Sequence, residues 1–289
     1  MRIAVVGLGV MGGSLARALT RRADDGGAGP DGTVTAWAAS PSDRAAAREA
    51  GVDVRDALES AVMGAELVVL ATPLSALAGL GTALAGELGD ALAPHAVISD
   101  VASLQKPALE VAGDVGLRDR WVTSHPLAGS ERSGFAASHP DLYHGAPVYL
   151  SAGPDSALHA RPAVVAMWEA VGAIPEWVDP TEHDEQMSLV SHLPQVVSTA
   201  LADAMAVGGL SAASLGPGGR DVTRLAGSSR AMWRDLLAHA DPSLVAALRA
   251  VANRLEEDAA SLERGDVEGP VERLQRAGEW LGGPTGGDE

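Results

Sequence analysis

Short runs of consecutive apolar residues recur along the first part of the chain, separated by stretches long enough to form helices. The first run covers residues 2–6, and others cover 33–38, 67–71, 96–99 and 121–123. Apolar runs of this length are typical of strands that are buried on both faces. The alternation of such strands with helices predicts a doubly wound parallel sheet.

The segments between these runs complete the pattern. Leu15, Ala18 and Leu19 have helical spacing and predict a helix over residues 12–22, followed by a Gly/Asp/Pro loop at 23–32. Runs at 147–151 and 174–178 predict edge strands around a helix near 164–171. The Gly-rich tail over 282–289 is expected to be frayed.

After about Asp179 the strand patterns stop and helical patterns take over. His183-Asp184 is expected to cap the first helix of this part, and Asp241-Pro242 predicts the start of another. One face of that later helix should lie in a core or a dimer contact, because its apolar residues recur at helical spacing: Leu244, Leu248, Val251, Leu255 and Leu262. We therefore predict an α/β domain over 1–179 and an all-helical domain over 180–289.

The loop between the first strand and the first helix carries a glycine motif. Gly7-Leu8-Gly9-Val10-Met11-Gly12 is a G-x-G-x-x-G, in which glycines let the backbone approach a pyrophosphate at the positive end of the helix. A plain glycine turn is the structural alternative. The position between strand and helix favours dinucleotide binding, so we interpret the α/β domain as a Rossmann-type domain.

Polar residues gather where three other predicted strands end: Thr72-Pro73, Asp100 to Ser103, and Ser124-His125-Pro126. Ligands of doubly wound sheets bind outside the carboxyl ends of the strands, so these residues should share one site with the glycine loop. His125 is a candidate base because imidazole exchanges a proton near neutral pH. A buried structural histidine is the alternative.

Composition excludes several classes of protein. The chain has no cysteine, which excludes disulfides and thiolate metal sites, and the remaining histidines are too scattered to predict any metal. Its net charge of -17 argues against nucleic acid. No apolar stretch is long enough to span a membrane, and the opening run is short and leads into glycines, as a strand rather than a signal peptide does. A cytoplasmic protein is expected.

Five segments resemble the signature blocks of prephenate/arogenate dehydrogenases. They are Gly7-Leu-Gly-Val-Met-Gly-Gly-Ser14, His125-Pro-Leu-Ala-Gly-Ser-Glu131, Ser191-His-Leu-Pro194, Arg220-Asp-Val-Thr-Arg224 and Met232-Trp-Arg-Asp235. The resemblance covers nearly the whole chain. It implies oxidative decarboxylation of prephenate to 4-hydroxyphenylpyruvate, with hydride transfer to NAD(P)+, and a homodimer formed through the helical domain.

The resemblance also implies roles for individual residues. His125 would hydrogen-bond the ring hydroxyl of the substrate together with Ser103, and Arg224 would bind a carboxylate of this dicarboxylate. Its alternative is a surface salt bridge with Asp221. The remaining substrate-site candidates are Glu131, Asp221, Trp233, His192 and Gln195.

Two of these candidates carry their own alternatives. His192 is equally well explained as a packed core histidine. Gln195 stands where many relatives have a second histidine, which leaves the choice between prephenate and arogenate open. Since no further domain is expected after residue 289, feedback by tyrosine would have to act at the active site.

Other functions compete with this interpretation. Arogenate dehydrogenase, giving tyrosine directly, differs only in the side chain of the substrate. A β-hydroxyacid dehydrogenase would need a lysine at the domain junction, and no lysine follows Lys106. A non-catalytic dinucleotide-binding regulator would carry the same motifs without turnover.

The cofactor preference depends on the end of the second strand. NAD sites usually have an acidic residue there, which repels a 2′-phosphate, but the corresponding residue is Ala38. Ser40, Ser42 and Arg44 could bind the phosphate, although Asp43 lies beside them. Besides the glycine motif, the cofactor-site candidates are therefore Ser40, Arg44, Thr72, Pro73 and Ser103, and NADP+ is expected to be accepted and slightly favoured over NAD+.

Overall fold

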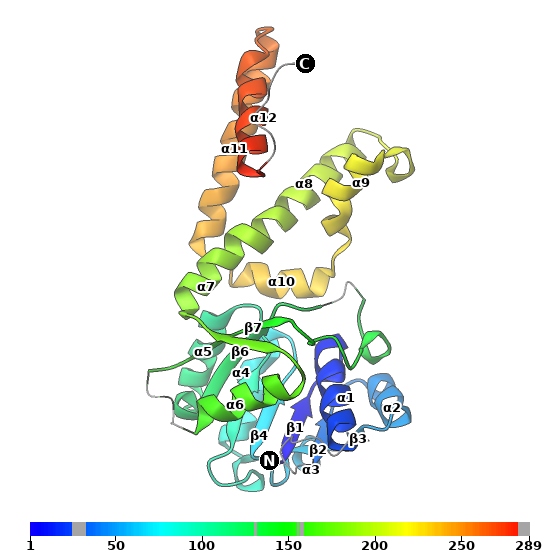
Figure 1. The fold of residues 1–289 in the computed structure, drawn as a ribbon, viewed down its shortest axis with the longest axis vertical. Coiled ribbons are helices and arrows are strands. Elements are labelled where there is room, and N and C mark those ends of the chain that lie inside the picture. The colour runs from blue at the N-terminus through cyan, green and yellow to red at the C-terminus, as the bar shows by residue number, and fades with distance from the viewer. Residues whose placement is uncertain (25–32, 130–131, 155, 157–158, 283–289) are drawn as a thin grey trace. The chain divides into compact units, whose positions relative to one another are not determined.

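The computed structural model describes residues 1–24, 33–129, 132–154, 156 and 159–282 (Figure 1). Most of the predicted loop over 23–32 and of the predicted tail lies outside these residues. The chain forms two compact units. The first comprises Met1–Gln186 and Gly227–Ala240, and the second comprises Met187–Ala226 and Asp241–Glu289.

The first unit is built around a sheet of eight strands in the order β3-β2-β1-β4-β5-β6-β7-β8. All neighbours pair in parallel except β6 and β7, which are antiparallel. The sheet reverses its order between β1 and β4, which is the point where doubly wound sheets bind ligands. The strands are β1 (Ile3–Val6), β2 (Val34–Trp37), β3 (Asp53–Val54), β4 (Leu67–Leu70), β5 (Val97–Asp100), β6 (Trp121–Pro126), β7 (Pro147–Ala152) and β8 (Ile174–Trp177).

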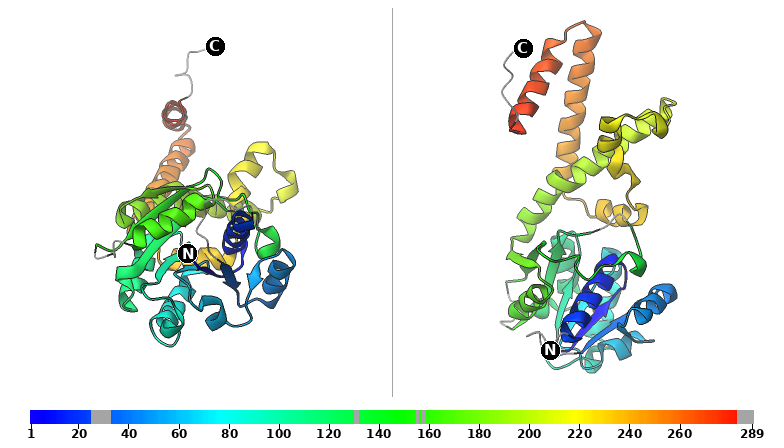
Figure 2. Two further views of the ribbon diagram at one scale, coloured as in Figure 1. Left: turned by 60° about the horizontal axis from the view of Figure 1, so that its bottom comes forward. Right: turned by 45° about the vertical axis from the view of Figure 1, so that its right-hand side comes forward.

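Helices cover both faces of this sheet (Figures 1 and 2). One core joins α1 (Val10–Asp24), α2 (Pro41–Glu49) and α6 (Ala160–Ala170) to one face, and the other joins α3 (Leu58–Val62), α4 (Leu74–Ala85) and α5 (Gln105–Asp114) to the opposite face. The residues of β1 and β4 are fully buried, because side chains of a central strand meet helices on both sides. Burial on both faces explains the unbroken apolar runs of these strands.

The predicted doubly wound sheet, followed by helices, is confirmed. Each predicted strand is present, and no end shifts by more than three residues. Strand β3 was not predicted, because two residues, Asp53 and Val54, are too few to give a hydrophobic pattern. The antiparallel direction of β7 was not predicted either, since direction depends on the connection and not on the strand itself.

The second unit is helical. It contains α8 (Leu193–Val207), α9 (Pro217–Thr223), α11 (Pro242–Glu263) and α12 (Glu268–Trp280). Helices α11 and α12 form an antiparallel hairpin (Figure 2), in which Arg273 pairs with Glu257 at 2.9 Å and Asp258 at 3.0 Å. Two helices that follow the sheet in sequence still belong to the first unit. They are α7 (Pro180–Met187), except for its last residue, and α10 (Arg230–Ala238).

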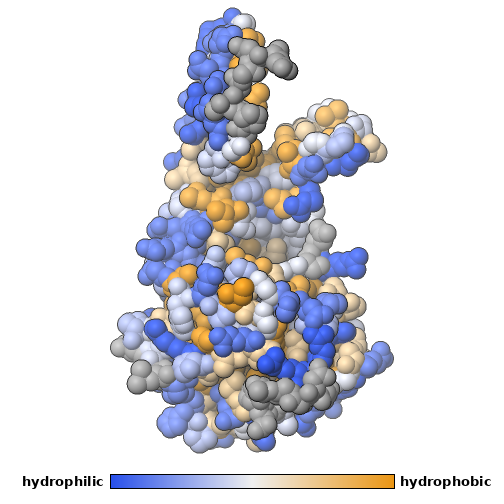
Figure 3. Space-filling view, in the orientation of Figure 1, coloured by the Kyte–Doolittle hydropathy of each residue, from blue (hydrophilic) through white to orange (hydrophobic). Residues whose placement is uncertain are grey.

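Many large apolar side chains of the second unit are exposed (Figure 3). On the predicted apolar face of α11, Leu244 is buried, whereas Leu255 and Leu262 are 63% and 58% exposed. Other exposed apolar side chains of this unit are Val207, Leu210, Leu274 and Trp280. In the described ranges, no helix combines the length and apolarity that crossing a bilayer requires.

Asp100, the last residue of β5, is fully buried and gathers hydrogen-bond donors. Its carboxylate accepts from the Ala102 amide at 2.9 Å, the Trp121 indole at 2.7 Å and the Thr123 hydroxyl at 2.9 Å. Burial raises its pKa from 3.8 to about 6, although these donors act in the opposite direction. The carboxylate thereby fixes the turn that follows β5.

We predict that Asp100→Asn destabilises the protein, and by more in acid than at neutral pH. The asparagine oxygen can still accept from Ala102 and Thr123, but its amide nitrogen would place hydrogens against the Trp121 indole donor, which costs a few kcal/mol. In the wild type, the favourable contribution of the raised pKa is complete below pH 3.8 and disappears as pH rises to about 6. This change amounts to about 3 kcal/mol and is absent from the variant.

Urea unfolding of both proteins at about pH 4.5 and 7.5 measures the effect. The difference in free energy of unfolding should shrink at the higher pH. Ser103→Ala is the control, since its hydroxyl is only half-buried. A pH-independent difference for Asp100→Asn would contradict the assignment.

Candidate active site

The glycine loop after β1 has the geometry of a pyrophosphate cradle. Gly7 has a φ of 102°, and a Cβ there would lie 2.2 Å from the Ala71 carbonyl oxygen. A Cβ on Gly12 would lie 1.9 Å from the Gly7 oxygen, so only glycine permits this approach of α1 to the strand. A Cβ on Gly9 would meet nothing within 4 Å. The open side of the loop lies at the N-terminus of α1, where a dinucleotide phosphate fits.

The segment that follows β2 contains a positive charge, Arg44, and a helix-capping serine, Ser40. Arg44 donates from Nη1 to the carbonyls of Ala38 and Ala39 at 2.5 and 3.2 Å. The Ser40 hydroxyl caps α2 by accepting from the Asp43 amide at 3.2 Å. Asp43 itself accepts from the amide of Phe135 at 2.8 Å. The Arg44 guanidinium therefore lies beside Ala38, where an acidic residue would otherwise stand.

The next strands add polar groups at the same edge of the sheet. Thr72, two residues after β4, has a buried hydroxyl without a hydrogen-bond partner in the described part of the chain. Pro73 begins the turn into α4. Ser103 is half-buried in the turn that Asp100 holds after β5. An unsatisfied buried hydroxyl at the ligand-binding edge is consistent with a bound nucleotide.

His125, near the end of β6, belongs to a chain of hydrogen bonds. Its Nδ1 lies 2.9 Å from Nε2 of His183, whose Nδ1 lies 2.8 Å from the Asp184 carboxylate. That carboxylate also accepts from the amides of Gln105 and Lys106 at 2.8 and 2.9 Å. His125 is half-buried, whereas His183 and Asp184 are almost completely buried.

The predicted role of Asp184 was wrong in one respect. Asp184 does cap a helix, but the helix is α5, whose first amides it binds, and not the helix α7 in which it lies. Residues 105 and 184 are distant in sequence, so no local pattern could predict the pairing. The involvement of His183 was missed for the same reason.

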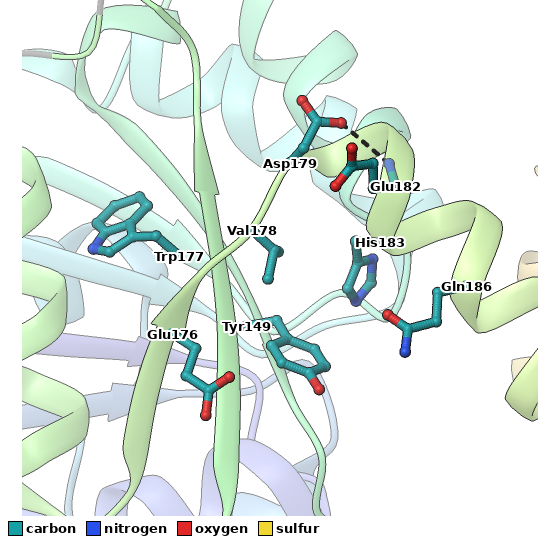
Figure 4. Close-up of a pocket in the computed structure, with 8 residues that line it drawn as sticks. All are labelled: Tyr149, Glu176, Trp177, Val178, Asp179, Glu182, His183 and Gln186. Atoms are coloured by element: carbon teal, nitrogen blue, oxygen red, sulfur yellow. Dashed lines mark hydrogen bonds between the residues drawn. The ribbon is translucent and has the colours of Figure 1, made fainter.

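His183 also lines a pocket beside β7 and β8 (Figure 4). Its volume is about 360 Å³. The Tyr149 and His183 rings meet edge to face, 5.6 Å apart. The lining residues come from β7, β8 and α7 and the segment between them: Tyr149, Glu176, Trp177, Val178, Asp179, Glu182, His183 and Gln186.

Helix α10 is attached to the first unit next to the cofactor edge. Asp235 accepts hydrogen bonds from the amide and hydroxyl of Ser75, in the first turn of α4, at 3.3 and 2.8 Å. Trp233 is half-buried on this helix. Asp235 thus fixes the segment that carries Trp233, a link that sequence analysis did not predict.

The other predicted substrate residues belong to the second unit. Gln195 is buried and donates to the Leu225 carbonyl at 2.7 Å, so its amide holds the turn that contains Arg224. His192 is buried in the π-helical turn before α8. Arg224 and Asp221 are exposed, and they form no salt bridge with each other in the described residues. Glu131 lies outside the described residues.

The sheet order, the glycine loop and the polar strand ends define a dinucleotide-binding protein of the Rossmann class. Comparison with protein families then identifies it more closely. Residues 15–175 match the nucleotide-binding domain of prephenate dehydrogenase, and residues 179–276 match its dimerization domain. The chain belongs to the prephenate dehydrogenase family.

Individual relatives support this assignment. The chain is 31% identical to a cyclohexadienyl dehydrogenase of Zymomonas mobilis, over 85% of this chain and 83% of the relative. It is 30% identical to a prephenate dehydrogenase of Bacillus subtilis, over 82% of this chain but only 63% of that longer protein. The solved structure of A. aeolicus prephenate dehydrogenase with hydroxyphenyl propionate and NAD+ matches with a TM-score of 0.82, 26% identity and 96% coverage of both chains.

We predict that two glycine substitutions separate folding from cofactor binding. Gly12→Ala places a methyl group against the backbone of Gly7 and should destabilise the loop and abolish binding of the nucleotide. Gly9→Ala has free space, so it should leave the melting temperature unchanged while weakening binding of the dinucleotide at least tenfold. Calorimetric titration and thermal unfolding test both effects. Tight binding by Gly9→Ala would place the phosphates elsewhere.

Proposed function

We propose that the protein oxidises and decarboxylates prephenate to 4-hydroxyphenylpyruvate, with hydride transfer to NAD(P)+. The main observation behind this proposal is the position of His125. It lies near the carboxyl end of β6, on the edge that also carries the glycine loop, in a chain of the prephenate dehydrogenase family. The half-buried imidazole can contact a substrate and still be shielded from bulk water.

The chemistry needs one proton acceptor. As the ring C–H leaves as hydride, the hydroxyl proton passes to Nε2 of His125 and the C–O bond becomes a carbonyl. Loss of the ring carboxylate as CO2 returns its bonding electrons to the ring, which becomes aromatic. The phenolate oxygen then recovers the proton from His125, so substrate and products balance without a further acid. The nicotinamide, when bound, supplies the hydride acceptor.

Binding of the two carboxylates requires fixed positive charge. Arg224 is the candidate for one of them, because guanidinium binds carboxylate in bidentate fashion. This residue is exposed and, among the described residues, it forms no ion pair with Asp221. Gln195 would position the turn of Arg224 rather than contact the substrate. We assign supporting roles in the pocket to Ser103, Glu131, Asp221, His192 and Trp233.

We further propose that the protein is a cytoplasmic homodimer. The match to the family's dimerization domain supports the dimer, as do the exposed apolar side chains that this unit presents. Large apolar surfaces of this kind are unfavourable in water and are usually covered by another subunit. The absence of cysteine from the sequence is compatible with a reducing compartment.

Turnover tests the proposed reaction. We expect the purified protein to release CO2 from prephenate and to reduce NAD(P)+, and His125→Asn to lower kcat by about a hundredfold to ten-thousandfold with little change in cofactor affinity. Arogenate is assayed in parallel to settle the substrate. Absence of turnover with both substrates, in a protein that binds nucleotide, would favour a regulatory role instead.

The cofactor preference follows from the end of β2. We propose a slight preference for NADP+, because Ala38 offers no carboxylate to repel the 2′-phosphate and the Arg44 guanidinium lies at its carbonyl. Asp43 opposes this effect only in part, since its carboxylate is turned to the Phe135 amide.

We therefore expect kcat/KM for NADP+ to equal or exceed that for NAD+, and Ala38→Asp to shift the ratio towards NAD+ by at least tenfold. Arg44→Ala should weaken binding of NADP+ more than of NAD+, as measured by titration of each nucleotide. A wild-type protein that rejects NADP+ would show that the phosphate is excluded by other residues.

A further inference from the structure

The hydrogen-bond chain from His125 to Asp184 fixes the direction in which each member donates. Asp184 receives two backbone amides of α5 together with the His183 ring, so its carboxylate acts only as an acceptor. Nδ1 of His183 must then carry the hydrogen of that bond. In a neutral His183 ring, Nε2 is therefore left as an acceptor.

The same reasoning extends to His125. Since Nε2 of His183 accepts, Nδ1 of His125 has to donate across the 2.9 Å that separates them. A neutral His125 then has its lone pair on Nε2. In this tautomer Nε2 is the ring nitrogen that can take a proton from a hydroxyl group.

Packing holds this arrangement in place. The side chains of His183 and Asp184 are 1% and 3% exposed. The His183 ring meets His125 at 5.0 Å and Tyr149 at 5.6 Å, both edge to face. Neighbouring rings on two sides restrict rotation of His183, and low exposure keeps water from competing for its hydrogen bonds.

We propose that His183 and Asp184 are positioning residues that hold neutral His125 with its proton on Nδ1 and stabilise the imidazolium formed during the reaction. The inference rests on the proposed function of His125 as the base. It goes beyond that function by assigning the choice of tautomer to two residues that do not touch the substrate. The alternative is a purely structural role, in which Asp184 caps α5 and His183 fills space.

The tautomer can be measured without turnover. Protein labelled with [15N]histidine gives long-range 1H–15N correlations that distinguish Nδ1–H from Nε2–H imidazole, and the His125 signals are identified by their loss in His125→Asn. We expect Nδ1–H in the wild type. His183→Phe keeps an aromatic ring against Tyr149 but offers no acceptor, so both tautomers should appear.

His144→Phe is the matched control, since His144 is exposed, and it should leave the His125 signals unchanged. An Nε2–H wild type, or an unaltered His125 tautomer in His183→Phe, would overturn the proposal. Because this result needs no substrate, it stands apart from any failure of the proposed reaction.

Turnover then tests the functional consequence. His183→Phe should lower kcat by about tenfold to a hundredfold and leave KM nearly unchanged. Substitution of a residue that binds the substrate would instead raise KM. His183 lines the pocket of about 360 Å³ and contacts His125, so His183→Gly leaves a space beside His125 that free imidazole can occupy. Added imidazole should restore turnover of His183→Gly but not of His183→Phe, whose ring still fills the site.

A second variant covers a failure of these proteins to fold. Asp184→Asn retains an oxygen that can cap α5 but can present an amide hydrogen to His183, which favours the opposite tautomer in both rings. It should show the same loss of kcat and an Nε2–H signal for His125. Wild-type kcat in a folded His183→Phe or Asp184→Asn protein would reduce both residues to a structural role.

Discussion

The parallel pairing of β1, β4, β5 and β6 is the constraint on which the site depends. Parallel strands end at one edge of the sheet, so groups that follow different strands are brought together without any contact between the intervening helices. The glycine loop, Thr72, Ser103 and His125 all follow from this single arrangement. The antiparallel strand β7 adds Tyr149 directly opposite His125.

Two buried carboxylates, Asp100 and Asp184, fix the positions of the groups at this edge of the sheet. Burial of a carboxylate is costly unless donors surround it, so each carboxylate fixes the groups that donate to it. Asp100 accepts from the Ala102 amide in the turn that carries Ser103, and from Trp121 and Thr123 on the neighbouring strand β6. It therefore ties this turn to β6. Asp184 connects α7 to the first turn of α5 and, through His183, to His125. Both carboxylates position other residues of the site and take no direct part in the proposed reaction.

The sequence predicted the features that depend on local pattern. Continuous apolar runs predicted the central strands, and a glycine motif between strand and helix predicted the loop whose open side Gly9 now marks. Long-range partners could not be predicted in this way. Asp184 has the composition of a local cap, and only the fold shows that its partners are the amides of Gln105 and Lys106. The hydrogen bond from Gln195 to the Leu225 carbonyl is another long-range contact that no local pattern predicts.

A chain with a net charge of -17 that is to bind a dianion and a phosphorylated cofactor must do so through local charge. At physiological ionic strength the field of a surface carboxylate decays over about 8 Å, so distant acidic residues oppose binding only weakly. What matters is the immediate environment of each anion. The N-terminus of α1 faces the place of the pyrophosphate, and Arg44 lies at the end of β2. Within the part of the chain that the structure describes, Arg224 forms no ion pair with Asp221, so that carboxylate does not cancel its charge. The acidic surface therefore governs solubility and association with other macromolecules, while a few oriented donors govern the ligands.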